Sequence, residues 1–471
     1  MEYRLLSRGM RRAVALLFSA APLPALAATT PGEYGPVWSL PFAALLLSIA
    51  LAPLLLPGVW HRHHGKIALA WAAAMLLPHA LAFGASPTLH LALHSLLDEY
   101  LPFVLLLAAL YTVSGGIALR GNLRGSAAHN TALLALGALA ASAMGTTGAA
   151  MLLVRPLIHA NDRRRRSAHV MVFFIFIVAN AGGALTPLGD PPLFLGFLRG
   201  VDFFWTLRHL AAPTALLCAM LLALFYALDS WFWRQPDQLK AADPTPDGPL
   251  QLLGRWNLLW LLAVVGIVLL SGSWSPPGGV ELFGVTLRWA ALARDAALLA
   301  VLLASLATTP REARRLNHFH WGPMLEVAKL FLGIFLTIIP VIEMLRVGTA
   351  GAFAPLVRLT SDVHGAPIPA AYFWLTGALS SVLDNAPTYL VFFNLAGGEP
   401  ARLMQEASVL GAISAGSVYL GAMTYVGNAP NLMVKAIAEH RGVDMPSFFG
   451  YIGWSLTVLL PCLLLVQALF F

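Results

Sequence analysis

Long apolar runs separated by short polar segments dominate this 471-residue chain. An α-helix needs roughly 20 apolar residues to cross a bilayer, and most of the runs reach that length. The predicted spans are residues 38–56, 67–84, 100–118, 168–198, 209–232, 253–272, 287–307, 323–346, 408–435 and 449–471. The pattern predicts an all-α polytopic membrane protein with about ten transmembrane helices.

Two further apolar stretches fit re-entrant hairpins better than full crossings. Residues 128–157 lie between two basic segments, one with Arg120 and the other with Arg163–Arg166. Basic loops favour the cytoplasmic side, so a single crossing would place one of them on the wrong side. We predict the hairpin tip at Gly145–Gly148, where glycine and threonine tolerate a turn. A second hairpin, residues 371–397, has "LDNAPT" at its tip and is entered from the opposite side.

The two Gly/Pro-interrupted spans, 168–198 and 408–435, match each other. "GALTPLGDPPLFL" begins at residue 183 and "GAMTYVGNAPNLM" at residue 421, an offset of 238. The same offset pairs Thr186 with Thr424, Gly189 with Gly427, Asp190 with Asn428, Thr146 with Asp384 and Thr147 with Asn385. We therefore predict two repeats of opposite orientation, 28–233 and 253–471, joined by a cytoplasmic linker at 234–252. Inverted repeats are typical of secondary transporters that work by alternating access.

Composition and charge agree with a membrane protein. The chain is 58% hydrophobic and 11% charged, whereas a soluble domain carries about 25% charged residues. The net charge of +7 comes from short loops between the spans, which indicates the positive-inside pattern and not nucleic-acid binding. Two cysteines, Cys218 and Cys462, lie in apolar spans and offer no disulfide or metal framework.

The first 27 residues have the pattern of a signal peptide. A basic segment precedes a short apolar stretch, which ends in the small-residue sequence Ala25–Leu26–Ala27. This pattern favours cleavage, and an uncleaved first helix is the alternative. With the spans, it predicts a multi-pass protein of the bacterial inner (plasma) membrane.

The broken spans and hairpin tips carry the candidate chemistry. Helix breaks at this depth line cavities, where free amides and carbonyls bind ions or substrates. Two of the polar residues there are carboxylates, Asp190 and Asp384. The other candidates are Asn385, Thr388, Thr146, Thr147, Thr186, Gly189, Thr424, Gly427 and Asn428.

A carboxylate in the membrane costs about 2.5–3.5 kcal/mol, so it is expected to be protonated or paired with a cation. Asp190 and Asp384 are therefore expected to be the ligands of a transported sodium ion or the carriers of a proton. The alternative is that each caps a half-helix, since aspartate is a favoured N-cap. The two roles are compatible.

Other residue patterns are less informative. The histidines of "HRHHGK" (61–66), His61, His63 and His64, are predicted to lie in a basic cytoplasmic loop, where interfacial anchoring is the simpler explanation. The chain has no GxGxxG, Walker or His-Glu-x-x-His motif and no soluble nucleotide domain. We expect neither an enzyme nor a resident cofactor, only transported Na⁺ and H⁺.

Three segments resemble the ion-transporter superfamily: "NAGGALTPLGDPPLFLGF", "SSVLDNAPTYLVFFNLAGG" and "TYVGNAPNLMVKAIAEHRGVDMPSFFGY". That superfamily contains NhaD-type sodium/proton antiporters, arsenite-permease-like proteins and dicarboxylate/sodium symporters. The chain is most similar to a bacterial branch described as sodium:proton antiporters or citrate transporters. The resemblance implies a homodimer with a scaffold and a moving transport domain. Dicarboxylate symporters carry Ser-Asn-Thr at both tips, whereas this chain has Gly145–Thr147 and Leu383–Asn385.

Two functions follow from these observations. The first is a sodium (cation)/proton antiporter, because an aspartate at a tip repels a multiply charged anion and favours a cation. The alternative is a sodium- or proton-coupled carboxylate transporter of the citrate type, with the anion held by half-helix amide ends. Both bind a small ion or small-molecule substrate within the lipid bilayer.

Overall fold

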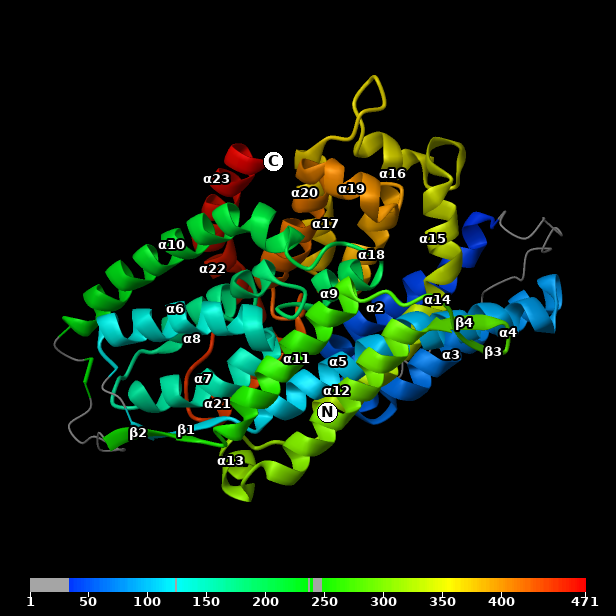
Figure 1. The fold of residues 1–471 in the computed structure, drawn as a ribbon. Helices are drawn as coiled ribbons and strands as arrows, with labels where there is room; N and C mark the ends of the chain where they lie inside the picture. Colours follow the sequence, from blue (N-terminus) through cyan, green and yellow to red (C-terminus); the bar gives the residue numbers. More distant parts are fainter. Residues whose placement is uncertain (1–33, 123–124, 236–237, 240–247) are drawn as a thin grey trace, which may run out of the picture.

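The structure is a computed structural model that describes residues 34–122, 125–235, 238–239 and 248–471. The predicted signal peptide, residues 1–27, lies outside the described residues. The described residues are predominantly helical (Figure 1). The prediction of an all-α polytopic membrane protein is confirmed.

The elements follow one another along the chain with short connections. The α-helices are α2 (Leu40–Leu55), α3 (Pro57–Phe83), α4 (Ala85–His94), α5 (Leu101–Gly115), α6 (Ala127–Met144), α7 (Thr146–Ala160), α8 (Ala168–Ile177), α9 (Pro191–Leu198), α10 (Trp205–Trp233), α11 (Trp256–Ser273), α12 (Trp289–Thr308), α13 (Arg311–Leu316), α14 (Gly322–Thr337), α15 (Ile339–Arg346), α16 (Ala354–Leu359), α17 (Pro369–Ser380), α18 (Asn385–Leu395), α19 (Pro400–Gln405), α20 (Ala407–Tyr419), α21 (Ala429–His440), α22 (Phe448–Trp454) and α23 (Leu460–Phe470). Short 3₁₀ segments are η1 (Pro36–Ser39), η3 (Ala181–Leu185), η4 (Gly348–Ala350) and η5 (Leu420–Met423), and η2 (Ser95–Tyr100) and η6 (Ser455–Leu459) are π-helical. The strands are β1 (Ala118–Asn122), β2 (Gly248–Leu253), β3 (Gly279–Leu282) and β4 (Val285–Arg288).

Within the described residues, nine helices are long and apolar enough to cross a membrane. The bent pair α14–α15, with an angle of 45°, makes a tenth candidate. One helix is longer than predicted, because α4, η2 and α5 run without a break over 85–115, where the sequence predicted a span only from residue 100.

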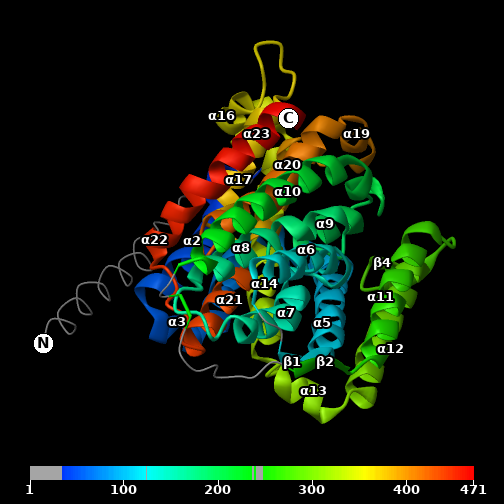
Figure 2. The ribbon, with the colours of Figure 1, turned by 90° about the vertical axis from the view of Figure 1, so that its left-hand side faces the viewer.

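Burial separates the central helices from those at the periphery. The apolar window that starts at α8 is 89% buried, whereas that of α11 is 17% buried. A helix that is apolar on all sides and buried belongs to the interior of a bundle. Figure 2 shows α11 and α12 along α5 at one flank and α3 at the opposite one, with α8 and the hairpins between. The predicted functional elements therefore occupy the protected middle of the molecule.

The basic segment at residues 61–66 was predicted to be a loop, but it is helical. It lies inside α3, which begins at Pro57 directly after Leu56. Proline fits the first turn of a helix, where its missing N–H leaves no bond unmade, so the chain turns there. The basic side chains then extend from the first turns of a helix, which long polar side chains tolerate at a membrane boundary.

The predicted linker, residues 234–252, also differs from the expectation at its C-terminal end. Residues 248–253 form β2, which pairs antiparallel with β1. Pairing of the two strands satisfies the backbone hydrogen-bonding groups of both segments. The sequence of either segment does not indicate the other as its partner. The next helix, α11, consequently starts at Trp256 and not at residue 253.

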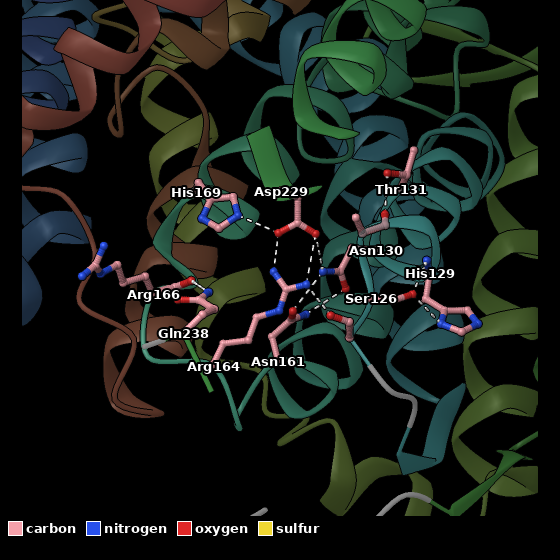
Figure 3. Close-up of polar contacts among 12 residues, drawn as sticks. Ser126, His129, Asn130, Thr131, Asn161, Arg164, Arg166, His169, Asp229 and Gln238 are labelled. Atoms are coloured by element: carbon pink, nitrogen blue, oxygen red, sulfur yellow. Dashed lines mark hydrogen bonds and ion pairs between the residues drawn. The ribbon is translucent and has the colours of Figure 1, made fainter. Parts of the chain in front are cut away.

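A buried polar network ties the base of the first hairpin to α8 and α10 (Figure 3). The Asp229 carboxylate accepts hydrogen bonds from Asn130 Nδ2 at 3.0 Å and from the guanidinium of Arg164. His169 Nε2 lies 2.8 Å from the same carboxylate, and Asn161 and Asn130 exchange two bonds of 2.9 Å. The Asp229 and Arg164 side chains are 0% and 1% exposed. Arg164, which was predicted to lie in a basic cytoplasmic loop, is thus an interior residue.

Asp229→Ala is expected to lower the free energy of unfolding by about 3–5 kcal/mol, because it leaves the Arg164 charge buried without a partner. The matched control is Glu312→Ala, which removes the surface pair with Arg120, whose side chains are more than half exposed. That change should cost less than about 1 kcal/mol. Thermal unfolding of the purified variants in detergent measures both effects, and equal shifts for the two variants would contradict the assignment.

Candidate functional site

Both broken helices are interrupted at their Gly/Pro-rich motifs. The first passes from α8 through η3 to α9, and the second from α20 through η5 to α21. Asp190 and Asn428 precede the second half-helices in extended conformations, with φ/ψ of −144°/142° and −148°/137°. Proline follows each of them in the first helical turn, where its fixed φ favours helix initiation.

The two breaks share contacts as well as backbone angles. The hydroxyl of Thr186 donates to Ser142 O at 2.5 Å, and that of Thr424 donates to Ser381 O at 2.5 Å. Each threonine hydroxyl also accepts from the backbone N–H two residues later at 3.2 Å. Hydroxyls that bond the backbone in this way hold an unwound segment in one conformation. These two threonines therefore shape the breaks.

One glycine in each break, Gly189 in the first and Gly427 in the second, allows two backbone segments to approach each other closely. A Cβ on Gly189 would lie 2.1 Å from the carbonyl oxygen of Gly183, and a Cβ on Gly427 would lie 2.5 Å from that of Gly421. Neither distance is possible without moving the backbone. The glycine signal in the sequence thus has a steric cause.

Gly189→Ala and Gly427→Ala are each expected to destabilise the fold by about 1–3 kcal/mol, since the added methyl group forces the backbone segments apart. Gly266→Ala in α11 is the control, because a Cβ there meets nothing within 4 Å. Unfolding temperatures in detergent measure the difference. Wild-type stability of both break variants would show that the observed contact is not required.

The hairpin tips turn at the predicted positions. α6 and α7 meet at Gly145, whose φ of 81° is accessible to glycine without strain. In the second hairpin, Asp384 is the N-cap of α18, and its carboxylate accepts from the backbone N–H of Ala386 at 3.2 Å. The hydroxyl of Thr388 donates back to the backbone oxygen of Asp384 at 3.1 Å. The capping role weighed for Asp384 is therefore present.

Asp190 joins the two hairpin tips. Its carboxylate accepts from the hydroxyl of Thr146 at 3.0 Å and from the amide of Asn385 at 2.6 Å. All three residues are at most 2% exposed. Its position matches an N-cap, but its side chain bonds no N–H of its own helix, unlike that of Asp384. The carboxylate of Asp190 therefore bonds to the two hairpin tips and not to its own helix.

A second set of amide contacts joins the two broken helices. Asn428 Nδ2 donates to Asn180 Oδ1 at 3.1 Å, and Asn180 Nδ2 donates to Asn431 Oδ1 at 2.8 Å. Asn431 Nδ2 in turn donates to the backbone oxygens of Gly421 and Thr424. Because each side-chain amide has both donors and acceptors, the network satisfies its own polar groups in the interior.

A cavity of about 160 Å³ lies where four helix N-termini meet. One part of its lining comes from the first turns or caps of α7, α9, α18 and α21, namely Gly145, Thr146, Thr147, Gly148, Asp190, Pro191, Asp384, Asn428, Ala429 and Pro430, and its polar side chains are those of Thr146, Thr147, Asp190, Asp384 and Asn428. Helix N-termini present the positive end of the helix dipole and unpaired N–H groups, except that α9 begins with two prolines, which have no N–H, and that the Ala386 N–H of α18 is bonded to Asp384. Two carboxylates and four dipole ends consequently face one space.

The opposite wall of the cavity is apolar and comes from α5 and α14. It includes Leu106, Leu110, Tyr111, Met324 and Phe331. These residues could not be recognised from the sequence, because the apolar segments around them look the same as those of lipid-facing helices. Tyr111, a phenol inside an apolar span, is the only one with a distinguishing signal.

The structure places the predicted site residues in two groups. Asp190, Asp384, Thr146, Thr147, Gly189 and Asn428 line the cavity. Asn385, Thr388, Thr186, Thr424 and Gly427 lie behind it and contact the tips or the backbone of the breaks. The five residues of the second group are positioned to hold the lining in place.

A family model described as "Putative citrate transport" matches residues 32–471. None of the curated proteins matches the chain. The matched region includes both hairpins, both breaks and the cavity.

Proposed function

The chain belongs to this citrate transport family, and from that premise we propose that it is a secondary transporter that couples movement of a carboxylate of the citrate type to a cation, Na⁺ or H⁺. Sequence analysis favoured a cation/proton antiporter and kept this function as its alternative. The family match supports the alternative better than the first choice.

The convergence of four helix N-termini on one cavity carries the proposal. Anions bind at helix N-termini because N–H groups and the dipole both favour negative charge. The contributing helices, α7, α9, α18 and α21, have 15, 8, 11 and 12 residues, so each has at least two turns. A substrate with several carboxylates could contact more than one N-terminus at a time.

The need for a cation follows from the two acidic side chains. Asp190 contacts neutral donors, and among the described residues no basic side chain lines the cavity or pairs with either carboxylate. A buried carboxylate without a basic partner needs a proton or a metal ion. Two carboxylates without a proton or a metal ion would repel a polyanion. Binding of the substrate would therefore require binding of the cation.

The residues then have distinct proposed roles. Asp190 and Asp384 hold the coupling cation, with Asn385 positioning Asp190. Thr146, Thr147 and Asn428 contact the carboxylate substrate together with the backbone N–H groups of the half-helices. The remaining candidates, Thr186, Gly189, Thr424, Gly427 and Thr388, maintain the breaks and tips.

The proposed cycle rests on two copies of one fold in opposite orientations. The equivalent backbone angles at Asp190 and Asn428, and the equivalent hydroxyl contacts of Thr186 and Thr424, support this relation. Inverted repeats allow the same site to open to either side in turn. We include in the proposal a homodimer in the bacterial inner membrane.

One observation favours a second candidate function. Because the cavity lining contains two carboxylates and no basic side chain among the described residues, a cation without an anion would also fit. A site that alternates between a proton and Na⁺ performs cation/proton exchange. The sodium/proton antiporter therefore remains the competing proposal.

A flux experiment separates the two functions. The protein is reconstituted in liposomes that contain a pH-sensitive dye, and uptake of radiolabelled citrate is measured under sodium, proton and no gradients. We expect citrate accumulation that depends on a cation gradient and is absent from empty liposomes. Proton flux triggered by sodium chloride alone, without citrate uptake, would overturn carboxylate transport in favour of the antiporter.

A further inference from the structure

A set of basic residues lies beyond the cavity, on the side that the positive-inside rule assigns to the cytoplasm. Arg155 follows the cavity-lining Gly148 by seven positions in α7, and His440 follows the cavity-lining Met433 by seven positions in α21. Residues seven apart share one face of a helix and are separated by roughly 10 Å along its axis. Both helices therefore lead from the cavity to a basic side chain.

A third element brings basic residues to the same place. His318 and His320 lie in the segment that precedes α14, whose first turn lines the cavity through Pro323. Partial desolvation lowers the pKa of His318, and the charges of Arg155, Arg441, His440 and His320 lower it further. The pKa of His318 thus responds to residues from α7, from the end of α21 and from its own segment. We call these five residues, together with His159, the basic cluster.

Charge within the basic cluster is poorly balanced. Arg441 lies close enough to Arg155 and to His159 to repel both of them. The acidic neighbours are Asp162, which acts on His159, Glu439, which is paired with Lys435, and Asp444, which lines a pocket with Arg441. The charged residues that act on Arg155 and His318 are nevertheless all basic.

Arg155 is the deepest member. Its Nη1 atom is buried and has no hydrogen-bond partner among the described residues. The phenol of Tyr111, which also lines the cavity, lies close to Arg155. The Tyr111 hydroxyl donates to the backbone oxygen of His320 at 2.8 Å, and its ring lies 5.2 Å from that of Phe319. Tyr111 thus adjoins both the cavity and Arg155.

The outer members face water, since His318, His440 and Arg441 are exposed. An exposed group of basic side chains that leads to Arg155, whose Nη1 atom is buried and has no partner among the described residues, is suited to an anion that arrives from solution. The field of such a group concentrates anions at a cleft and raises their association rate, an effect that salt screens.

We propose that the basic cluster is an access site for polyvalent carboxylates, with Arg155 as the residue that receives the anion before it passes Tyr111 into the cavity. The proposal rests on the proposed function, because it assumes that the substrate is an anion. It also explains substrate specificity. The electrostatic attraction between the basic cluster and the substrate grows with the charge of the substrate, so trivalent citrate is attracted more strongly than a monocarboxylate.

The test compares wild-type protein with Arg155→Gln, Arg155→Lys and the control Arg311→Gln, whose exposed residue in α13 is outside the basic cluster. Citrate uptake into liposomes and citrate binding to the purified protein are measured from low to high ionic strength. For Arg155→Gln we expect, at low salt, a KM and a Kd raised about tenfold, a maximal rate within about twofold of wild type and a flatter salt dependence. Arg155→Lys should restore most of the affinity, and Arg311→Gln should behave as wild type.

The outcomes separate this inference from the proposed function. Citrate uptake with the same KM and salt dependence in wild type and Arg155→Gln would overturn the access site and leave carboxylate transport standing. Salt-sensitive citrate binding that depends on Arg155 but occurs without uptake would overturn carboxylate transport and support the access site. Absence of both binding and uptake would overturn both.

Discussion

Asp190→Asn is expected to reduce cation-driven citrate uptake by at least about thirtyfold, since loss of one member of a buried charge pair costs about 2–5 kcal/mol. The substitution keeps the shape of the side chain and its place between Thr146 and Asn385, but removes the negative charge that would hold the cation. Uptake of radiolabelled citrate into liposomes under a fixed sodium and proton gradient measures the effect.

The control for this variant is Asp202→Asn. Asp202 is an exposed carboxylate between α9 and α10, and its Oδ1 atom forms a surface ion pair with Arg208 Nη1 at 3.7 Å. Because surface ion pairs contribute little, loss of its charge should leave uptake within about twofold of wild type. Unfolding temperatures of both variants show whether the fold is intact. Normal cation coupling in a folded Asp190→Asn protein would remove this residue from the proposed mechanism.

Asp384→Asn is expected to abolish transport while leaving the protein stable. Asparagine caps helices about as well as aspartate, so the bond to the Ala386 N–H can be kept while the charge is lost. Asp384→Ala should lose transport and, in addition, about 0.5–2 kcal/mol of stability, because it removes the cap. The pair of variants therefore separates capping from cation binding, with uptake and thermal unfolding measured on the same preparations.

A contrary result would be equally clear. If Asp384→Asn transports citrate at the wild-type rate and only Asp384→Ala is impaired, Asp384 serves the helix and not the cation. The cation would then depend on Asp190, the other carboxylate that lines the cavity.

The local features of the fold were predictable from the sequence. Glycine, proline and polar residues inside an apolar run are conspicuous, and they marked the turn at Gly145, the cap at Asp384 and the break before Asp190. Each of these features depends on backbone rules that act over a few residues. The number of candidate spans also followed from the length of the apolar runs, but not all of their identities did. The helix α6, predicted as one arm of a hairpin, is long enough to count as a span, whereas the predicted span 408–435 contains only a shorter apolar helix, Ala407–Met423.

Long-range contacts were not predictable. The bond between Asn385 and Asp190 joins residues 195 positions apart, and nothing in either motif indicates the other as a partner. Leu106 and Phe331 line the cavity, although their surroundings in the sequence resemble those of lipid-facing residues. Arg164 was expected in a loop by the positive-inside rule but is buried against Asp229, because a charge pattern does not reveal a buried counter-ion.

The choice between substrates illustrates the same limit. From the sequence, the aspartate at a hairpin tip favoured a cation as the substrate, because it would repel a multiply charged anion. The four half-helix N-termini of the cavity become a single feature only in three dimensions, and they favour an anion beside the cation. The family match agrees with this second interpretation.

The most direct test of the central claim is a structure determined in a lipid nanodisc in the presence of citrate and sodium. The account predicts citrate in the cavity, with its carboxylates against the first turns of α7 and α21 and a cation beside Asp190 or Asp384. Citrate bound elsewhere, or a cavity that holds a cation and excludes citrate at saturating concentration, would contradict it.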